Sequence, residues 1–299
     1  MNKNFSIWGM SYGIIGDLIM ALPMLTYFEK KYPNSYKYWV IDKKCAQSAP
    51  LYFNHPLIDR IKITDGWDSF GAQDELLMNA CDLVIPKGAQ HDDPDYYNFR
   101  SKIEETACMN GITDIKDILT EEELKPRLCK WFDVGVPAVT STYAKSKNEN
   151  QEQYHNNIAI WPLFAGSQGR SPSPKWWNVL IDGLIFKGYT VSHYGMPWDP
   201  ILSNLKGYKT FPNLSYFDQV KAALASRLVI GTDSGAQWVM GAYSHPAINL
   251  MTNWLPDHRT NLLALEPVND NGQTFHAMGG CDNIPIRQVI NNVIEKAPL

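Results

Sequence analysis

The stretch "LVIGTDSGAQWVMGAY", Leu228 to Tyr243, joins an apolar run to a glycine-containing turn and then to a helical pattern. It predicts a buried strand, a turn that contains Asp233, Ser234 and Gly235, and a helix. The first amides of a helix lack internal partners and carry the positive end of its dipole, so this turn could hold a phosphate group without a metal ion. The alternative is that Asp233 or Ser234 only caps the helix, as these residue types commonly do.

The same alternation of apolar runs and helical stretches extends through the whole chain, which is typical of βαβ units around a parallel sheet. In the first half we predict the strands FSIW, YKYWVI, DRIKI and CDLVIP, and a helix from Asp17 to about Tyr32. In the second half the predicted order is strand NIAIWPLF, helix Pro174 to Lys187, strand YTVSHYG, helix SYFDQVKAALAS, strand RLVIGTD, helix GAQWVMGAY, strand PAINLM and helix IRQVINNVIEK.

A polar segment, KSKNENQEQYHNN from Lys145 to Asn157, separates the two halves and has the composition of an exposed linker. A chain of 299 residues is longer than the size at which one core usually stops growing, so two domains are expected. We place them at residues 1–150 and 151–299. The predicted fold class is therefore α/β, with two domains of parallel sheet and a ligand-binding cleft between the carboxyl ends of their strands.

Composition excludes several classes of protein. With 44% hydrophobic and 19% charged residues, the chain is neither disordered nor fibrous, and a net charge of -4 argues against coating nucleic acid by bulk charge. The sequence shows no apolar run of membrane-spanning length and no signal-peptide pattern, so we expect a soluble, cytoplasmic protein. The five cysteines form no CxxC pair, which predicts reduced, packed thiols.

A second phosphate-facing loop is predicted in "FAGSQGRSPSPKWW", Phe164 to Trp177, which follows the first strand of the second half. Ser167 and Gln168 supply hydrogen-bond donors, and Arg170 and Lys175 supply positive charge. A guanidinium suits bidentate phosphate recognition particularly well. The alternative is an ordinary solvated basic loop.

Near the N-terminus, "GDLIMALPML" starts at Gly16 and places Asp17 at the beginning of an apolar helix. Gly13 and Gly16 are suited to a tight turn after the first strand. Asp17 is either a helix N-cap or a carboxylate that accepts a proton from a hydroxyl group. The residue types alone leave both interpretations open.

These three stretches, in this order and spacing, resemble glycosyltransferase family 9, the heptosyltransferases, which have the GT-B fold of two facing Rossmann-like domains. "IIGDLIMALPML" resembles the family's N-terminal Gly-Asp motif with its following Leu-Pro, and "GSQGRSPSPKWW" the loop that opens its donor domain. The segment from "LSYFDQVKAALAS" to "PAINLM" is similar to the most specific part of the family, with its Asp-Ser/Thr-Gly turn, and "CDNIPIRQVINNVI" to its usual C-terminal end.

By this resemblance Asp17 falls on the proposed catalytic base, with Gly13 and Gly16 in the acceptor-side loop. The donor side is implied to include Ser167, Gln168, Arg170, Lys175, Asp233, Ser234, Gly235, Ala236 and Trp238. The chain departs from the family at two places. Trp238 stands where the family usually carries a His, and "RSPSPKWW" lacks the common Lys-Arg-Trp-Pro order. An indole cannot accept a proton or carry charge, so any ionic help at position 238 is absent.

The resemblance implies an inverting, metal-independent glycosyltransferase that needs no cofactor beyond its nucleotide-sugar substrate. A glycan or lipopolysaccharide-type acceptor is the expected partner, while modified nucleic acid and protein acceptors stay open. Two alternatives are a nucleotide-sugar epimerase of the same fold and a catalytically silent nucleotide- or carbohydrate-binding protein.

Two further groups of residues could bind a ligand. "HDDPDYY" contains Asp93 and Asp95 in an Asp-x-Asp order, but Pro94 and the tyrosines favour a turn over a metal site. His193 lies in a predicted strand where a nucleotide base or ribose would pass, although a lone strand histidine is more often part of the core.

Overall fold

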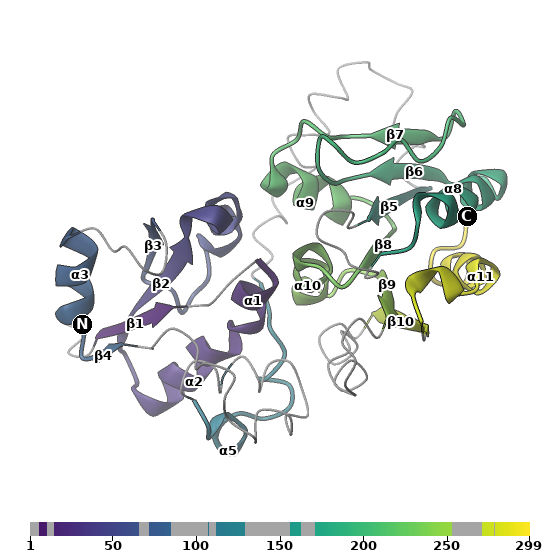
Figure 1. Ribbon diagram of the computed structural model, residues 1–299. Coiled ribbons are helices and arrows are strands. Elements are labelled where there is room, and N and C mark those ends of the chain that lie inside the picture. The colour runs from purple at the N-terminus through teal and green to yellow at the C-terminus, as the bar shows by residue number, and fades with distance from the viewer. Residues whose placement is uncertain are drawn as a thin grey trace. The chain divides into compact units, whose positions relative to one another are not determined.

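The computed structural model describes residues 6–10, 15–65, 72–84, 107, 112–128, 156–162, 171–252, 271–277 and 279–299. The chain divides into two compact units, Met1–Cys129 and Lys130–Leu299, shown in Figure 1. This division differs from the domains that we infer from the sequence only within residues 130–150, none of which is among the described residues. The boundary therefore stays a proposal, and each unit is described by itself.

The first unit contains a parallel sheet with the strand order β3-β2-β1-β4. The chain passes from β1 through β2 to β3 on one side and then returns to pair β4 on the other side of β1. The topological switch point therefore lies at β1, where open α/β sheets place their ligands. The elements are β1 Ser6–Met10, α1 Ile15–Met20, α2 Pro23–Lys31, β2 Tyr36–Asp42, the 3₁₀ helix η1 Lys43–Tyr52, β3 Arg60–Thr64, α3 Ala72–Asn79, β4 Leu83–Val84 and α5 Ile115–Ile118.

The helix that we predict from Asp17 to about Tyr32 is wrong as a single element, because it is divided into α1 and α2. Pro23 has no backbone N–H, and its ring clashes with the carbonyl four residues earlier in a continuous helix. At the junction the backbone hydrogen bonds span three residues instead of four. Leu22 N donates to Ile19 O at 3.1 Å, and Met24 N donates to Ala21 O at 3.0 Å. Asp17 therefore lies on a short helix with its own hydrogen-bonding pattern.

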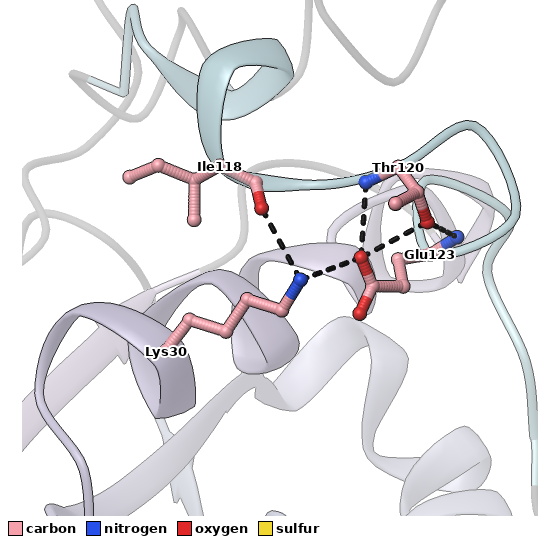
Figure 2. Close-up of polar contacts among 4 residues, drawn as sticks. All are labelled: Lys30, Ile118, Thr120 and Glu123. Atoms are coloured by element: carbon pink, nitrogen blue, oxygen red, sulfur yellow. Dashed lines mark hydrogen bonds and ion pairs between the residues drawn. The ribbon is translucent and has the colours of Figure 1, made fainter.

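A network of polar contacts ties α2 to the segment 115–128, as Figure 2 shows. Lys30 Nζ lies 2.6 Å from Glu123 Oε2 and donates to Ile118 O at 3.2 Å. The same carboxylate oxygen accepts from Thr120 N at 2.9 Å and from the Thr120 hydroxyl at 3.0 Å. These donors hold the pKa of Glu123 at about 2, with the Lys30 hydrogen bond as the largest cause.

We expect this network to stabilise the first unit only while Glu123 is ionised. A carboxyl whose pKa is lowered on folding contributes stability above its unfolded pKa of about 4.5, and that contribution is lost as the pH falls toward 2. The variant Glu123→Gln should therefore melt slightly below the wild type at pH 7 and level with it near pH 2. The check is a series of thermal melts across this range, with exposed Glu121→Gln as the control; an equal difference at both pH values would contradict the expectation.

The second unit contains a parallel sheet with the strand order β10-β9-β8-β5-β6-β7. Figure 1 shows α9 and α10 on one side of this sheet and α8 and α11 on the other. The elements are β5 Asn157–Trp161, α8 Pro174–Phe186, β6 Thr190–His193, β7 Tyr208–Thr210, α9 Tyr216–Leu224, β8 Leu228–Thr232, α10 Gly235–Ala242, β9 Ala247–Thr252, β10 Gly272–Ala277, the 3₁₀ helix η5 Cys281–Asn283 and α11 Ile286–Lys296.

The core of this unit forms between the sheet, α8 and α11. Four α8 residues at helical spacing are fully buried in it, namely Trp177, Leu180, Ile181 and Leu184. The predicted limits of α8 are confirmed within one residue, because Ser173 caps its start and Gly188 follows its end with a φ of 96°. That left-handed conformation suits glycine, which has no Cβ to clash.

The interior strands of the second sheet are predicted correctly, whereas its two edge strands are not. β5 and β8 are buried along their whole length. Strands of this kind have continuous apolar runs, and those runs predict them. β7 and β10 form the edges, and their sequences, YKT and GQTFHA, carry polar residues and no continuous apolar run. An edge strand pairs on one side only, so its sequence pattern is weaker.

Candidate functional site

The carboxyl ends of β5 and β8 form the topological switch point of the second sheet. From β5 the chain runs outward through β6 to β7, and then returns to β8 on the opposite side of β5. Trp161, the last residue of β5, is in register with Gly231 of β8. The loop after β5 and the turn after β8 therefore leave the sheet side by side. These are the two stretches that the sequence predicts to face phosphate.

Ser234 occupies the N-cap position of α10 without capping the helix through its side chain. Its backbone is fully extended, with φ -154° and ψ 162°, and its side chain makes no cap hydrogen bond. The interpretation of Ser234 as a simple side-chain cap is therefore wrong. The first backbone bond of the helix is made by Trp238 N, which donates to Ser234 O at 3.2 Å. Amides in this first turn have no partner within the helix, so they can bind an anion.

Trp238 packs into the unit instead of standing open to solvent. It is 4% exposed, and its indole Nε1 lies 3.4 Å from Asp233 Oδ1, toward which it donates. Asp233 is half-buried. The indole is thus a neutral donor beside this carboxylate, at the position where the family that the sequence resembles usually has a histidine. Ala236 is buried in the first turn of the same helix.

Gln237 and Thr232 belong to this turn and were missed by sequence reasoning. Both are almost fully buried, and the Thr232 hydroxyl and both polar atoms of the Gln237 side chain lack hydrogen-bond partners among the described residues. Buried polar groups are rarely left unpaired, because each loses its bonds to water. A glutamine in a first helical turn carries no sequence signal for burial, so only the structure reveals it.

Asp17 lies in the first turn of α1, at its third residue, and is half-buried. The helix begins at Ile15, so the predicted start at Asp17 is wrong, and so is the alternative in which Asp17 is its N-cap. The prediction of a tight turn at Gly16 is wrong for the same reason, since Gly16 is a buried residue of α1. A carboxylate in a first turn still interacts favourably with the positive end of the helix dipole. Gly13 lies outside the described residues.

Asp42 and Cys45 lie near Asp17 at this edge of the first sheet, and no local sequence pattern connects the three residues. Asp42 ends β2, the strand beside β1, and its Oδ1 accepts from Lys44 N at 2.7 Å, which caps η1. Burial raises the pKa of the Cys45 thiol to about 11, and the negative charges of Asp42 and Asp17 add to that rise. Cys45 is thus a protonated thiol near two carboxylates.

The remaining predicted donor-side residues divide into two groups. Lys175 is exposed in the first turn of α8. Ser167, Gln168 and Arg170 lie outside the described residues, so their roles stay predictions.

His193, the last residue of β6, is part of the core. Its Nδ1 lies 2.8 Å from the Tyr208 hydroxyl, and burial lowers its pKa to about 4. The imidazole is therefore neutral at pH 7 and packs as the more ordinary interpretation expects.

Two kinds of feature are absent from the part of the chain that the structure describes. There, no group of three or more His, Cys, Asp or Glu residues is arranged to hold a metal ion. Asp93 and Asp95 lie outside those residues. None of the described helices combines the length and the apolar character needed to cross a bilayer.

No family model matches the chain, and no curated protein matches it. Solved structures do resemble it. Escherichia coli ADP-heptose lps heptosyltransferase II superposes with a TM-score of 0.72 at 15% identity, and the match covers 98% of each chain. The chain has the fold of the heptosyltransferases.

Two further structures extend this comparison. A glycosyl transferase family 9 protein from Veillonella parvula gives a TM-score of 0.68 at 14% identity, over 99% of this chain and 97% of that one. TibC, an iron-containing dodecameric glycosyltransferase from enterotoxigenic E. coli, gives 0.53 at 15% identity, over 83% of this chain and 60% of that one. At these identities the likeness shows the fold, and the predicted GT-B fold class is confirmed.

Proposed function

We propose that the chain is an inverting glycosyltransferase that needs no metal ion and moves a sugar from a nucleotide-sugar to an acceptor hydroxyl. The second unit binds the donor, and the first unit binds the acceptor. The observation that carries this proposal is the turn between β8 and α10, where Ser234 leaves the helix N-terminus uncapped by its side chain at the switch point of the sheet. Such a terminus suits the diphosphate of a nucleotide-sugar.

Each group in the proposed reaction has one task. Asp17 accepts the proton of the acceptor hydroxyl. As the proton leaves, the oxygen of that hydroxyl attacks the anomeric carbon from the face opposite the diphosphate. The bond between that carbon and the diphosphate oxygen breaks, and the released nucleoside diphosphate takes up the bonding electrons. The amides of Gly235 and Ala236, together with Arg170, offset the charge that develops on this leaving group.

The choice of substrate class follows from the structural neighbours. One acts on lipopolysaccharide with ADP-heptose, according to its description, so an ADP-sugar and a glycan or lipopolysaccharide-type acceptor are the first candidates. Trp238 differs from the usual histidine of the related family, so the donor sugar is best identified by testing several nucleotide-sugars. The iron in TibC makes metal dependence a point for direct measurement.

We expect nucleoside diphosphates to raise the melting temperature of the protein. A ligand at one hundred times its Kd stabilises the native state by about 2.7 kcal/mol, which is readily measured in a thermal-shift assay. ADP, GDP and UDP should be compared with the corresponding nucleosides, which lack the phosphates that the α10 N-terminus would bind. We expect each diphosphate to raise the melting temperature by the same amount with and without EDTA.

A crystal structure with the best diphosphate then tests the position of the site. The phosphates should lie beside Ser234 and Gly235. A diphosphate bound elsewhere, or a panel in which no nucleotide shifts the melting temperature, would contradict the proposed donor site. Loss of binding in EDTA would contradict metal independence alone.

A further inference from the structure

The sequence at the start of α10 is suited to close the N-terminus of its own helix, yet the structure leaves it open. Ser234 and Gln237 stand at the N-cap and the third helical position, which is the spacing of a capping box. In a closed box the serine hydroxyl accepts from the third amide, and the glutamine side chain accepts from the serine N–H. Here Ser234 Oγ and the Gln237 carboxamide are both buried, with no partner among the residues described.

Two other helices of the same unit also begin after a serine, and both are capped. Ser173 Oγ accepts from Trp176 N at 3.3 Å, and Ser215 Oγ accepts from Asp218 N at 3.1 Å. These two serines have φ values of -62° and -58°, in contrast to -154° at Ser234. The open N-terminus of α10 is therefore a local property of this turn.

Gly231 accounts for the position of the Gln237 side chain. A Cβ at residue 231 would stand 2.2 Å from Gln237 Nε2 and 3.0 Å from its Cδ, so the carboxamide occupies the space that a side chain would take. Gly231 has no positive φ, which means that the glycine provides room and not an unusual backbone conformation. The strand cannot move aside easily, because Gly231 is paired with Trp161 on one side and Asn249 on the other.

We propose that Gly231 is a positioning residue that keeps the N-terminus of α10 open for a phosphate group, because it leaves room against β8 for the Gln237 side chain. Held against β8, the carboxamide does not return to the Ser234 N–H, so it does not compete with a nucleoside diphosphate for this amide or for the serine hydroxyl. The inference rests on the proposed function for the identity of the ligand. The arrangement of the cap itself can be measured without any ligand.

The decisive variant is Gly231→Ala, whose new methyl group displaces the Gln237 side chain and lets it cap Ser234. Closing a cap is a modest effect, so we expect the Kd for ADP to rise about five- to tenfold and the Ser234 amide to exchange its hydrogen more slowly by a similar factor. Calorimetry and NMR hydrogen exchange provide the two readouts. Gln237→Ala, which has no carboxamide to close the cap, should bind ADP within a few-fold of the wild type.

The double variant Gly231→Ala/Gln237→Ala separates a cap from general damage to the strand. It should recover both ADP affinity and fast exchange at Ser234, and a double variant as weak as Gly231→Ala would overturn the inference. If Gly231→Ala does not fold, hydrogen exchange in the wild type still tests the inference. Its Ser234 amide should exchange faster than that of Ser173, which donates to Asp282 Oδ1 at 2.5 Å, and slow exchange at Ser234 would overturn the inference. A wild type that binds no ADP would instead count against the proposed function, while the exchange pattern continues to decide the cap.

Discussion

Replacing Asp17 with asparagine should lower sugar transfer by about 10²- to 10⁴-fold, the usual contribution of a general base. Asparagine has nearly the same volume as aspartate and cannot take up a proton. Asp17 is half-buried in the first turn of α1, where loss of its charge removes a favourable charge–dipole interaction, so we expect a modest loss of stability. The measurement is kcat at saturating donor, with the acceptor on which the wild type turns over.

A matched control is available in the same unit. Asp117 also lies in the first turn of a helix, α5, and is exposed. The variant Asp117→Asn loses the same type of charge–dipole interaction and should keep wild-type activity. If Asp17→Asn folds normally and transfers sugar within a few-fold of the wild type, Asp17 only stabilises its helix, and another group must accept the proton.

The second large effect is expected from Arg170→Ala, which should weaken donor binding by about 1.5–3 kcal/mol, the usual range for a hydrogen bond to a charged group. This corresponds to an increase in Kd of about 10- to 150-fold, because each 1.4 kcal/mol is a factor of ten. Arg170 follows β5, whose carboxyl end lies beside the α10 turn, although the residue itself is outside the described part of the chain. Titration calorimetry with the nucleoside diphosphate measures the effect directly.

Exposed Arg287 on α11 provides the control for Arg170, because Arg287→Ala removes the same charge from a helix surface. A change in net charge alone would weaken binding equally in the two variants. Donor affinity that is unchanged in Arg170→Ala would remove this residue from the site, while leaving the amides of α10 as the expected phosphate-binding groups.

The sequence predicted those parts of the fold in which burial leaves a strong pattern. β5 and β8 are buried on both faces and show unbroken apolar runs, whereas the edge strands β7 and β10 lack them. The division between α1 and α2 could have been anticipated, because Pro23 was visible in the sequence. Helical spacing of the apolar residues alone conceals such a break.

The candidate site was predictable only where one short stretch contains it. Asp233, Ser234 and Gly235 follow a strand directly, so their place at its carboxyl end could be inferred. The closeness of Asp17 to Cys45 depends on the pairing of β1 with β2, which no local pattern specifies. The burial of Gln237 against Gly231 depends likewise on how α10 packs over β8.

The parallel pairing of both sheets also affects how the chain folds as it is synthesised. Neighbouring parallel strands need long crossover connections, and Ser6 at the start of β1 bonds to Asp82, 76 residues later, just before β4. At about 5–20 residues per second, a ribosome needs about 4–15 s to make that stretch. During this interval β1 has no partner on its β4 side. The nascent first unit should therefore depend most on chaperones before residue 84 has emerged.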